Sequence, residues 1–113
     1  MSGYNWIKIA DTETEIPLAP NGIAVMDVDG KRMCVGKANG EWVAFAYKCP
    51  HASGIMAGGY FDATGNVVCP THRYKFNPVN GRNTSGEGYY LKTWPVEVRE
   101  DGIFVGMKKG WFS

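Results

Sequence analysis

The stretch that decides the fold runs from Cys49 to Phe76 and reads CPHASGIMAGGYFDATGNVVCPTHRYKF. Each end carries a short Cys–His pair, Cys49-Pro50-His51 and Cys69-Pro70-Thr71-His72, with 17 residues between the two pairs. The glycines and prolines within the stretch favour loops over a long strand. Because functional side chains concentrate on loops held by a rigid scaffold, we expect two loops that together form a site.

The concentration of ligand-type residues in these loops points to metal binding. The chain contains two histidines, and both lie here with two of its three cysteines. A single-ion zinc site usually groups its cysteines and its histidines separately along the chain, whereas here Cys precedes His in both pairs. Two loops of this kind can meet so that both thiolates reach one iron and both imidazoles reach a second iron, which is the arrangement of a Rieske [2Fe-2S] centre.

The motifs CPHASG and GGYFDATGNVVCPTHRYKF closely resemble those of Rieske ferredoxins and Rieske domains. The resemblance implies that Cys49 and Cys69 bind an inner iron and that His51 and His72 bind an outer iron near the surface. It further implies one [2Fe-2S] cluster per chain and a single domain over residues 1–113. In that domain a small cluster-binding subdomain, about residues 49–76, is inserted in a larger antiparallel base.

The ligand set also predicts the redox range of such a centre. With two thiolates and two neutral imidazoles the oxidised site is neutral, whereas four thiolates would leave it doubly negative, so an added electron is accepted more easily. Respiratory members of the family carry an extra Cys in each loop and Ser and Tyr donors after the second His. This chain has Gly54, Thr71, Tyr74 and Phe76 at those positions. We therefore expect a low-potential centre, in the lower part of the Rieske range of about −150 to +300 mV.

Other residues around the motif have alternative interpretations. Ser53, Thr71 and Arg73 are candidate hydrogen-bond donors to the centre, and Phe76 is expected to pack in the core. Ile55 and Met56 could contact a redox partner or could pack the loop. The stretch Asn83 to Tyr90 lacks the proline that covers the cluster in many Rieske ferredoxins. A looser cover is therefore expected.

The rest of the chain predicts an all-β fold, a sandwich or barrel of antiparallel strands. Asp29-Gly30, Asn39-Gly40, Asn80-Gly81 and Asp101-Gly102 are turn signals. Little or no helix is expected, because no stretch shows a sustained helical period. Glu41 to Tyr47 is apolar on both faces and predicts an interior strand. The other predicted strands are Ile23 to Val28, Lys31 to Lys37, Trp94 to Val98 and Ile103 to Gly106.

Composition excludes several classes of protein. The 113 residues carry a net charge of +1, with 44% hydrophobic and 20% charged residues, so neither a disordered chain nor a nucleic-acid partner is indicated. No window approaches a membrane span, and Met1 to Ala10 lacks the apolar region of a signal peptide. A cytoplasmic protein with reduced thiols is expected, with Cys34 as a buried structural thiol.

The function expected from the resemblance is that of a soluble electron carrier rather than an enzyme. Both histidines are used at the centre, so none is left for the mononuclear iron of an oxygenase, and no nucleotide motif suggests a reductase. We expect the ferredoxin component that passes electrons from a flavin-containing reductase to a terminal oxygenase of the aromatic-ring dioxygenase type. The alternatives are a small Rieske subunit bound to an oxidoreductase large subunit, as in nitrite reductase, and a zinc-binding structural module.

Overall fold

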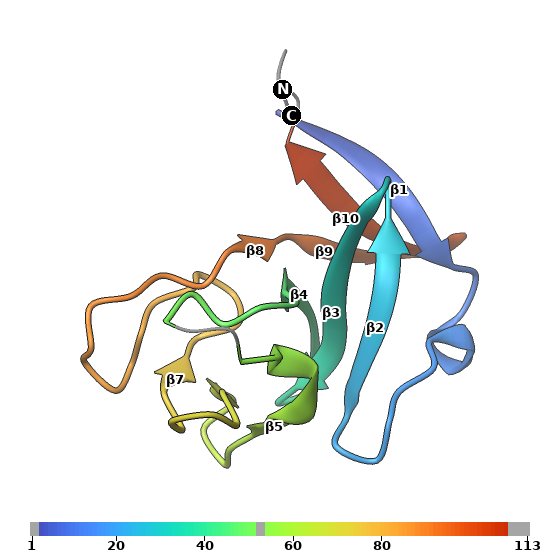
Figure 1. Cartoon of the computed structure of the whole chain (residues 1–113). Helices are drawn as coiled ribbons and strands as arrows, with labels where there is room; N and C mark the ends of the chain where they lie inside the picture. Colours follow the sequence, from blue (N-terminus) through green and yellow to red (C-terminus); the bar gives the residue numbers. More distant parts are fainter. Residues whose placement is uncertain (1–2, 52–53, 109–113) are drawn as a thin grey trace.

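The computed structural model describes residues 3–51 and 54–108, and nearly all its regular structure is antiparallel β-sheet. The strands form three sheets, with orders β1-β10-β9, β2-β3-β4-β8 and β5-β6-β7 (Figure 1). The only helical segments among these residues are two three-residue 3₁₀ turns, η1 (Glu13–Glu15) and η2 (Met56–Gly58). The expected all-β fold is confirmed. None of the described helical segments is long and apolar enough to cross a membrane.

Two of the sheets form the base of the molecule. The four-stranded sheet contains β2 (Ile23–Val28), β3 (Lys31–Ala38), β4 (Glu41–Ala46) and β8 (Thr93–Trp94), and the second sheet contains β1 (Tyr4–Ala10), β10 (Gly102–Lys108) and β9 (Val96–Arg99). Fully buried side chains such as Met33, Val35 and Val105 fill the space between them. As predicted from its two apolar faces, β4 lies in the interior of its sheet, between β3 and β8.

Two of the four predicted Asx-Gly turns join consecutive strands of the four-stranded sheet. Asp29-Gly30 links β2 to β3 and Asn39-Gly40 links β3 to β4, and all four residues have φ between +50° and +81°. This is the left-handed conformation that a two-residue hairpin turn needs, and Asn, Asp and Gly adopt it most readily. These turns fix the register of the sheet whose strand β4 leads into the first cysteine loop.

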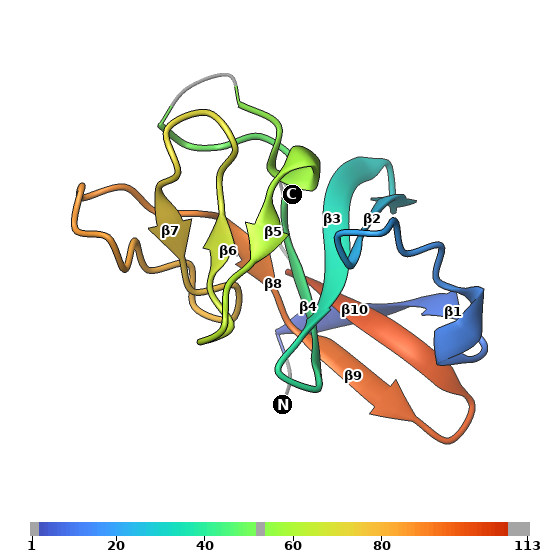
Figure 2. The same cartoon turned by 90° about the horizontal axis from the view of Figure 1, so that it is seen from below.

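The predicted continuous strand from Trp94 to Val98 is wrong, because Pro95 divides it. Thr93–Trp94 pairs with β4, whereas Val96–Arg99 pairs with β10 in the other sheet. Proline has no N–H to donate to a ladder, and its carbonyl instead accepts a hydrogen bond from the N–H of Gly106 at 2.9 Å. The strand therefore changes sheets at Pro95 and ties the two sheets of the base together (Figure 2).

The third sheet lies within the stretch of residues 49–76, to one side of the base (Figures 1 and 2). It contains β5 (Tyr60–Phe61), β6 (Val67–Val68) and β7 (Lys75–Phe76). The Phe61 ring packs edge-on against Phe45 of β4, with ring centroids 6.0 Å apart, and it lies directly on Gly36 of β3. A Cβ at Gly36 would stand 2.8 Å from this ring, so glycine is required for the small sheet to seat on the base.

Hydrogen bonds to one carboxylate, that of Asp62, close the connection between β5 and β6. The Asp62 carboxylate accepts hydrogen bonds from the backbone N–H groups of Thr64 and Asn66, at 2.9 and 3.0 Å, and from the Thr64 hydroxyl at 2.8 Å. Burial opposes ionisation of Asp62, but these hydrogen bonds outweigh it and lower the pKa of the carboxyl from 3.8 to about 2. The turn that supports the second cysteine loop therefore depends on an ionised Asp62.

We expect Asp62→Asn to lower the free energy of unfolding by about 1 kcal/mol at neutral pH, since charge-assisted hydrogen bonds to a partly solvated carboxylate are lost. Because folding lowers this pKa, the stabilisation is complete above 3.8 and is lost as the pH falls towards 2. Urea unfolding followed by tryptophan fluorescence at pH 7 and about pH 5 should give the same difference. Asp101→Asn, in an exposed turn, is the control. A difference that vanishes at the lower pH would contradict the assignment.

Candidate metal centre

The first cysteine loop follows the end of β4 and is closed by backbone hydrogen bonds. The N–H of Cys49 donates to the carbonyl of Gly54 at 2.8 Å, and the N–H of Met56 donates to the carbonyl of Tyr47 at 2.8 Å. Lys48 and Ile55 form an isolated antiparallel bridge between these two bonds. The loop therefore leaves and rejoins a short ladder, which holds Cys49 at its base and carries His51 outward.

The second cysteine loop is the turn of the β6–β7 hairpin. The N–H of Cys69 donates to the carbonyl of Tyr74, and the N–H of Arg73 donates to the carbonyl of Cys69, both at 2.9 Å. Arg73 has φ +59°, a conformation that costs a residue other than glycine on the order of 1 kcal/mol. The tight turn places Cys69 at the base of the hairpin and His72 at its tip, which repeats the arrangement of the first loop.

The two cysteines are buried together beneath the loops. Cys49 is 4% exposed and Cys69 is 1% exposed, and both belong to a second hydrophobic core, separate from the one between the two base sheets, with Phe45 and Phe76. The loops touch at Gly54, where an added Cβ would stand 3.1 Å from the Cys69 sulfur and would collide with the Thr71 hydroxyl. The bases of the two loops thus come into direct contact at the Cys69 thiol.

The two histidines meet above them, towards the surface. The Nδ1 atoms of His51 and His72 are 3.2 Å apart, and the ring centroids are 4.6 Å apart. Two imidazole nitrogens bound to one tetrahedral metal at about 2.0–2.1 Å lie roughly 3.3 Å from each other. The facing nitrogens therefore fit two ligands of one metal atom.

The thiol pair and the imidazole pair do not surround one single-ion position among the described residues. Within residues 3–51 and 54–108, no three side chains of His, Cys, Asp or Glu come close enough together to hold a single metal ion. A zinc ion with two Cys and two His ligands would need all four groups around one point. Two buried thiols below two paired imidazoles instead fit a cluster with two metal atoms, one for each pair.

Two tyrosines make the surroundings of the histidines unequal. His51 packs against Tyr74, at 4.3 Å between ring centroids, and against Tyr89, at 5.2 Å, and the two tyrosine rings stack on each other. Burial raises the pKa of the Tyr74 hydroxyl above its usual value of 10.0. His51 is accordingly half-buried, whereas His72 is exposed. His72 therefore forms most of the solvent-exposed edge of the centre.

Asn83 organises the loop that carries Tyr89. Its side-chain amide donates to the Lys75 carbonyl and to the Glu87 carboxylate, both at 2.9 Å, and its side-chain oxygen accepts from the N–H of Glu87. Ser85 also donates to Glu87. Hydrogen bonds from Ser85 and Asn83 lower the pKa of Glu87, and the nearby His51 contributes to the same shift. The stretch Asn83 to Tyr90 has no proline. Its hydrogen bonds and the stacked Tyr74 and Tyr89 rings hold it in place over the His51 side of the centre.

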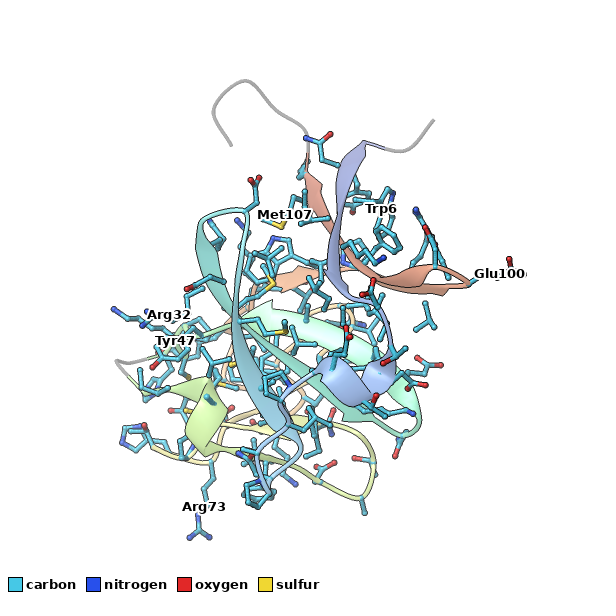
Figure 3. The ribbon with its side chains drawn as sticks, turned by 90° about the vertical axis from the view of Figure 1, so that its right-hand side faces the viewer. Trp6, Arg32, Tyr47, Arg73, Glu100 and Met107 are labelled. Atoms are coloured by element: carbon cyan, nitrogen blue, oxygen red, sulfur yellow. The ribbon has the colours of Figure 1, made fainter. Side chains whose placement is uncertain are left out.

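The structure decides several of the alternative interpretations. Phe76 and Met56 are fully buried and pack the core, and Ile55 is half-buried. Cys34 is also fully buried, and burial raises the pKa of its thiol to about 12, as fits a structural thiol. The Arg73 side chain points away from the protein (Figure 3). Ser53 lies outside the described residues, so its role as a hydrogen-bond donor stays a prediction.

Three features of the site were not predicted from the sequence. The packing of Tyr89 on His51, the hydrogen-bonding role of Asn83 and the ionised Glu87 all belong to the stretch Asn83 to Tyr90. The sequence signal was an Asn with Ser and Glu two and four residues later, a spacing that lets one side-chain amide bond both.

Comparison with known proteins gives one family and several relatives. The family model described as "Rieske [2Fe-2S] domain" matches residues 5–95. The ferredoxin component of naphthalene 1,2-dioxygenase/salicylate 5-hydroxylase systems from Ralstonia sp is 25% identical over 105 residues, covering 92% of this chain and 97% of the relative.

Two solved structures share the fold. The ferredoxin of carbazole 1,9a-dioxygenase from Nocardioides aromaticivorans IC177 is 24% identical, with a TM-score of 0.76, covering 92% of this chain and 99% of that one. A chain from the complex of reduced oxygenase and oxidized ferredoxin in carbazole 1,9a-dioxygenase is 25% identical, with a TM-score of 0.73, covering 92% and 95%.

Proposed function

This chain belongs to the Rieske [2Fe-2S] domain family, and we propose that it is the ferredoxin component of an oxygenase system, a protein that carries one electron at a time between two other proteins. The proposal rests on one observation. The Nδ1 atoms of His51 and His72 face each other 3.2 Å apart, and two buried cysteines lie beneath them. The domain implies one [2Fe-2S] cluster per chain. The curated relative at 25% identity, a ferredoxin component, favours this function over a nitrite reductase small subunit.

In the proposed centre Cys49 and Cys69 hold the inner iron, and His51 and His72 hold the outer iron. When bound, the cluster supplies reversible storage of one electron. The chain keeps the two thiolates away from water in the core beneath the loops, and it carries the imidazoles outward. Tyr74 and Tyr89 hold the His51 ring in place, while His72 is left exposed. We infer that partners approach the His72 side, where the path to the cluster is shortest.

The proposed partners are a flavin-containing reductase as donor and a terminal oxygenase as acceptor. A solved chain of similar fold belongs to a complex of an oxygenase with a ferredoxin, which supports an oxygenase as the acceptor. The chain has two histidines, and both are assigned to the cluster. None is left for the two-histidine, one-carboxylate iron site of an oxygenase, so we propose a carrier without catalytic activity, acting in the cytoplasm.

We further propose a potential in the lower part of the Rieske range, and Glu87 supports it. Its carboxylate is ionised at neutral pH, since hydrogen bonds from Ser85 and Asn83 hold its pKa below the ordinary 4.5, and it lies near enough to His51 for the two to interact electrostatically. A negative charge near a centre that gains negative charge on reduction opposes the electron. Tyr74 and Phe76 occupy the positions where Ser and Tyr would donate hydrogen bonds to the cluster sulfurs and raise the potential.

Potentiometric titration of the purified protein tests this proposal. We expect a reversible one-electron curve with a midpoint near the low end of the range from about −150 to +300 mV. In Glu87→Gln the midpoint should rise by about 20–40 mV, the effect of removing one solvent-screened charge near the centre. Glu100→Gln, in an exposed turn remote from Arg73 (Figure 3), should leave the midpoint unchanged. An irreversible titration would contradict the carrier function, and a midpoint in the upper half of the range would contradict the low potential.

A further inference from the structure

A basic cleft lies on the flank of the molecule, beside the first cysteine loop. Its volume is about 530 Å³. Figure 3 shows two of its residues, Arg32 and Tyr47, side by side between Arg73 at the lower tip and Met107 at the opposite end. The cleft is lined by four basic side chains and two aromatic rings, namely Lys31, Arg32, Lys48, Lys92, Tyr47 and Trp94.

The cations of this cleft come from separate parts of the chain. Lys31 and Arg32 begin β3, Lys48 follows β4, and Lys92 precedes β8. Arg32 lies over the Tyr47 ring and Lys92 over the Trp94 ring, each 5.5 Å from the ring centroid. Such stacking restrains a cation without neutralising it. Two of the four cations of the cleft, Arg32 and Lys92, are therefore held in restrained positions.

These charges are largely uncompensated by the protein itself. Arg32 has an exposed ion pair with Asp27, at 3.6 Å, whereas the three lysines of the cleft have no ion pair within the described residues. Four cations and Asp27 give the cleft a charge of +3. Since the whole chain carries +1, all the other residues together carry −2. Positive charge is therefore concentrated in the cleft.

We propose that this cleft docks an extended acidic segment of a protein that exchanges electrons with this chain, an inference that rests on the proposed carrier function. The four cations suit several carboxylates spaced along a polypeptide. The Tyr47 and Trp94 rings provide an apolar wall for the stems of side chains, and this wall offers nothing to a bare inorganic anion. A protein segment is thus favoured over a small anion.

The position of the cleft connects docking with electron exchange. Lys48 directly precedes Cys49, and it pairs with Ile55 on the returning leg of the first loop. A segment bound in the cleft therefore lies against the base of the loop that carries His51. It would orient the partner beside the centre and speed the encounter at low ionic strength.

Binding of a blocked hexaglutamate peptide to the cluster-loaded, full-length protein tests the proposal, measured by calorimetry at low ionic strength. In Lys31→Glu/Lys92→Glu the affinity for the peptide should fall ~tenfold, because two attractions become repulsions. The matched control, Arg82→Glu/Lys108→Glu, makes the same change in net charge at exposed positions outside the cleft. It should change the affinity less than ~threefold, an effect of screened net charge alone.

Three results would overturn the proposal: no binding of hexaglutamate, equal losses in the two double variants, or tighter binding of inorganic triphosphate than of the peptide. Tighter triphosphate binding would make the cleft a small-anion site. The visible spectrum of each variant shows whether the cluster is retained. Peptide binding does not depend on redox activity, so failure of the potentiometric titration and failure of the docking proposal are separate outcomes.

Discussion

Replacing Cys69 by alanine is expected to remove the [2Fe-2S] cluster, and replacing Cys49 should do the same. Loss of even an outer-shell partner weakens metal binding 10–100-fold, so loss of a direct thiolate should cost more than ~100-fold. Both thiols are buried in the second core, and cluster binding there adds directly to folding stability. Iron and acid-labile sulfide, measured per chain after anaerobic purification, should fall to near zero.

Cys34 provides a matched control for this prediction. Its thiol is also fully buried and belongs to the same core, but it lies within β3 and in neither loop. Cys34→Ala should retain iron, sulfide and colour, with a loss of about 1 kcal/mol or less in unfolding free energy for the small cavity. A Cys69→Ala protein with normal iron and sulfide, or a Cys34→Ala protein without them, would refute the ligand assignment.

The second large effect is expected at Gly54, where the two loops touch. Its backbone does not need the left-handed conformation, so the constraint is steric. In Gly54→Ala the new methyl group would collide with the Thr71 hydroxyl and press on the Cys69 sulfur at 3.1 Å. We expect a loss of about 1–3 kcal/mol in unfolding free energy, typical of overpacking, and faster bleaching of the visible absorbance.

Gly58→Ala is the control for this substitution. The nearest atom to an added methyl there is Cγ of Pro70 at 3.6 Å, an ordinary van der Waals contact. Its unfolding free energy should change by less than about 0.5 kcal/mol. Equal stability of the two alanine variants, with equal bleaching rates, would show that the loops do not meet at Gly54 as described.

The local features of the fold could be predicted from the sequence because each depends on neighbouring residues. Asn39-Gly40 makes a hairpin turn by its own conformational preference, and the apolar faces of β4 require an interior position. The Cys–His pairs were likewise informative, because thiol and imidazole groups at this spacing suit little else than metal binding. Pro95 was misjudged because alternation of apolar residues carries no information on which sheet a strand joins.

The features that were not predicted depend on residues distant in sequence. Tyr89 reaches His51 across 37 intervening positions, and its orientation follows from the hydrogen bonds of Asn83. The basic cleft joins Lys31 and Arg32 to Lys92, which meet when β3, β4 and β8 form one sheet. In the sequence alone these three cations look like ordinary surface charges. Their shared environment emerges with the sheet topology.

The electron paramagnetic resonance spectrum of the dithionite-reduced protein tests the central claim most directly, with iron and acid-labile sulfide measured on the same sample. The account predicts a Rieske-type signal from a cluster with two thiolate and two imidazole ligands, at two irons and two sulfides per chain, as a Rieske centre requires. A colourless, silent sample that contains zinc would contradict it.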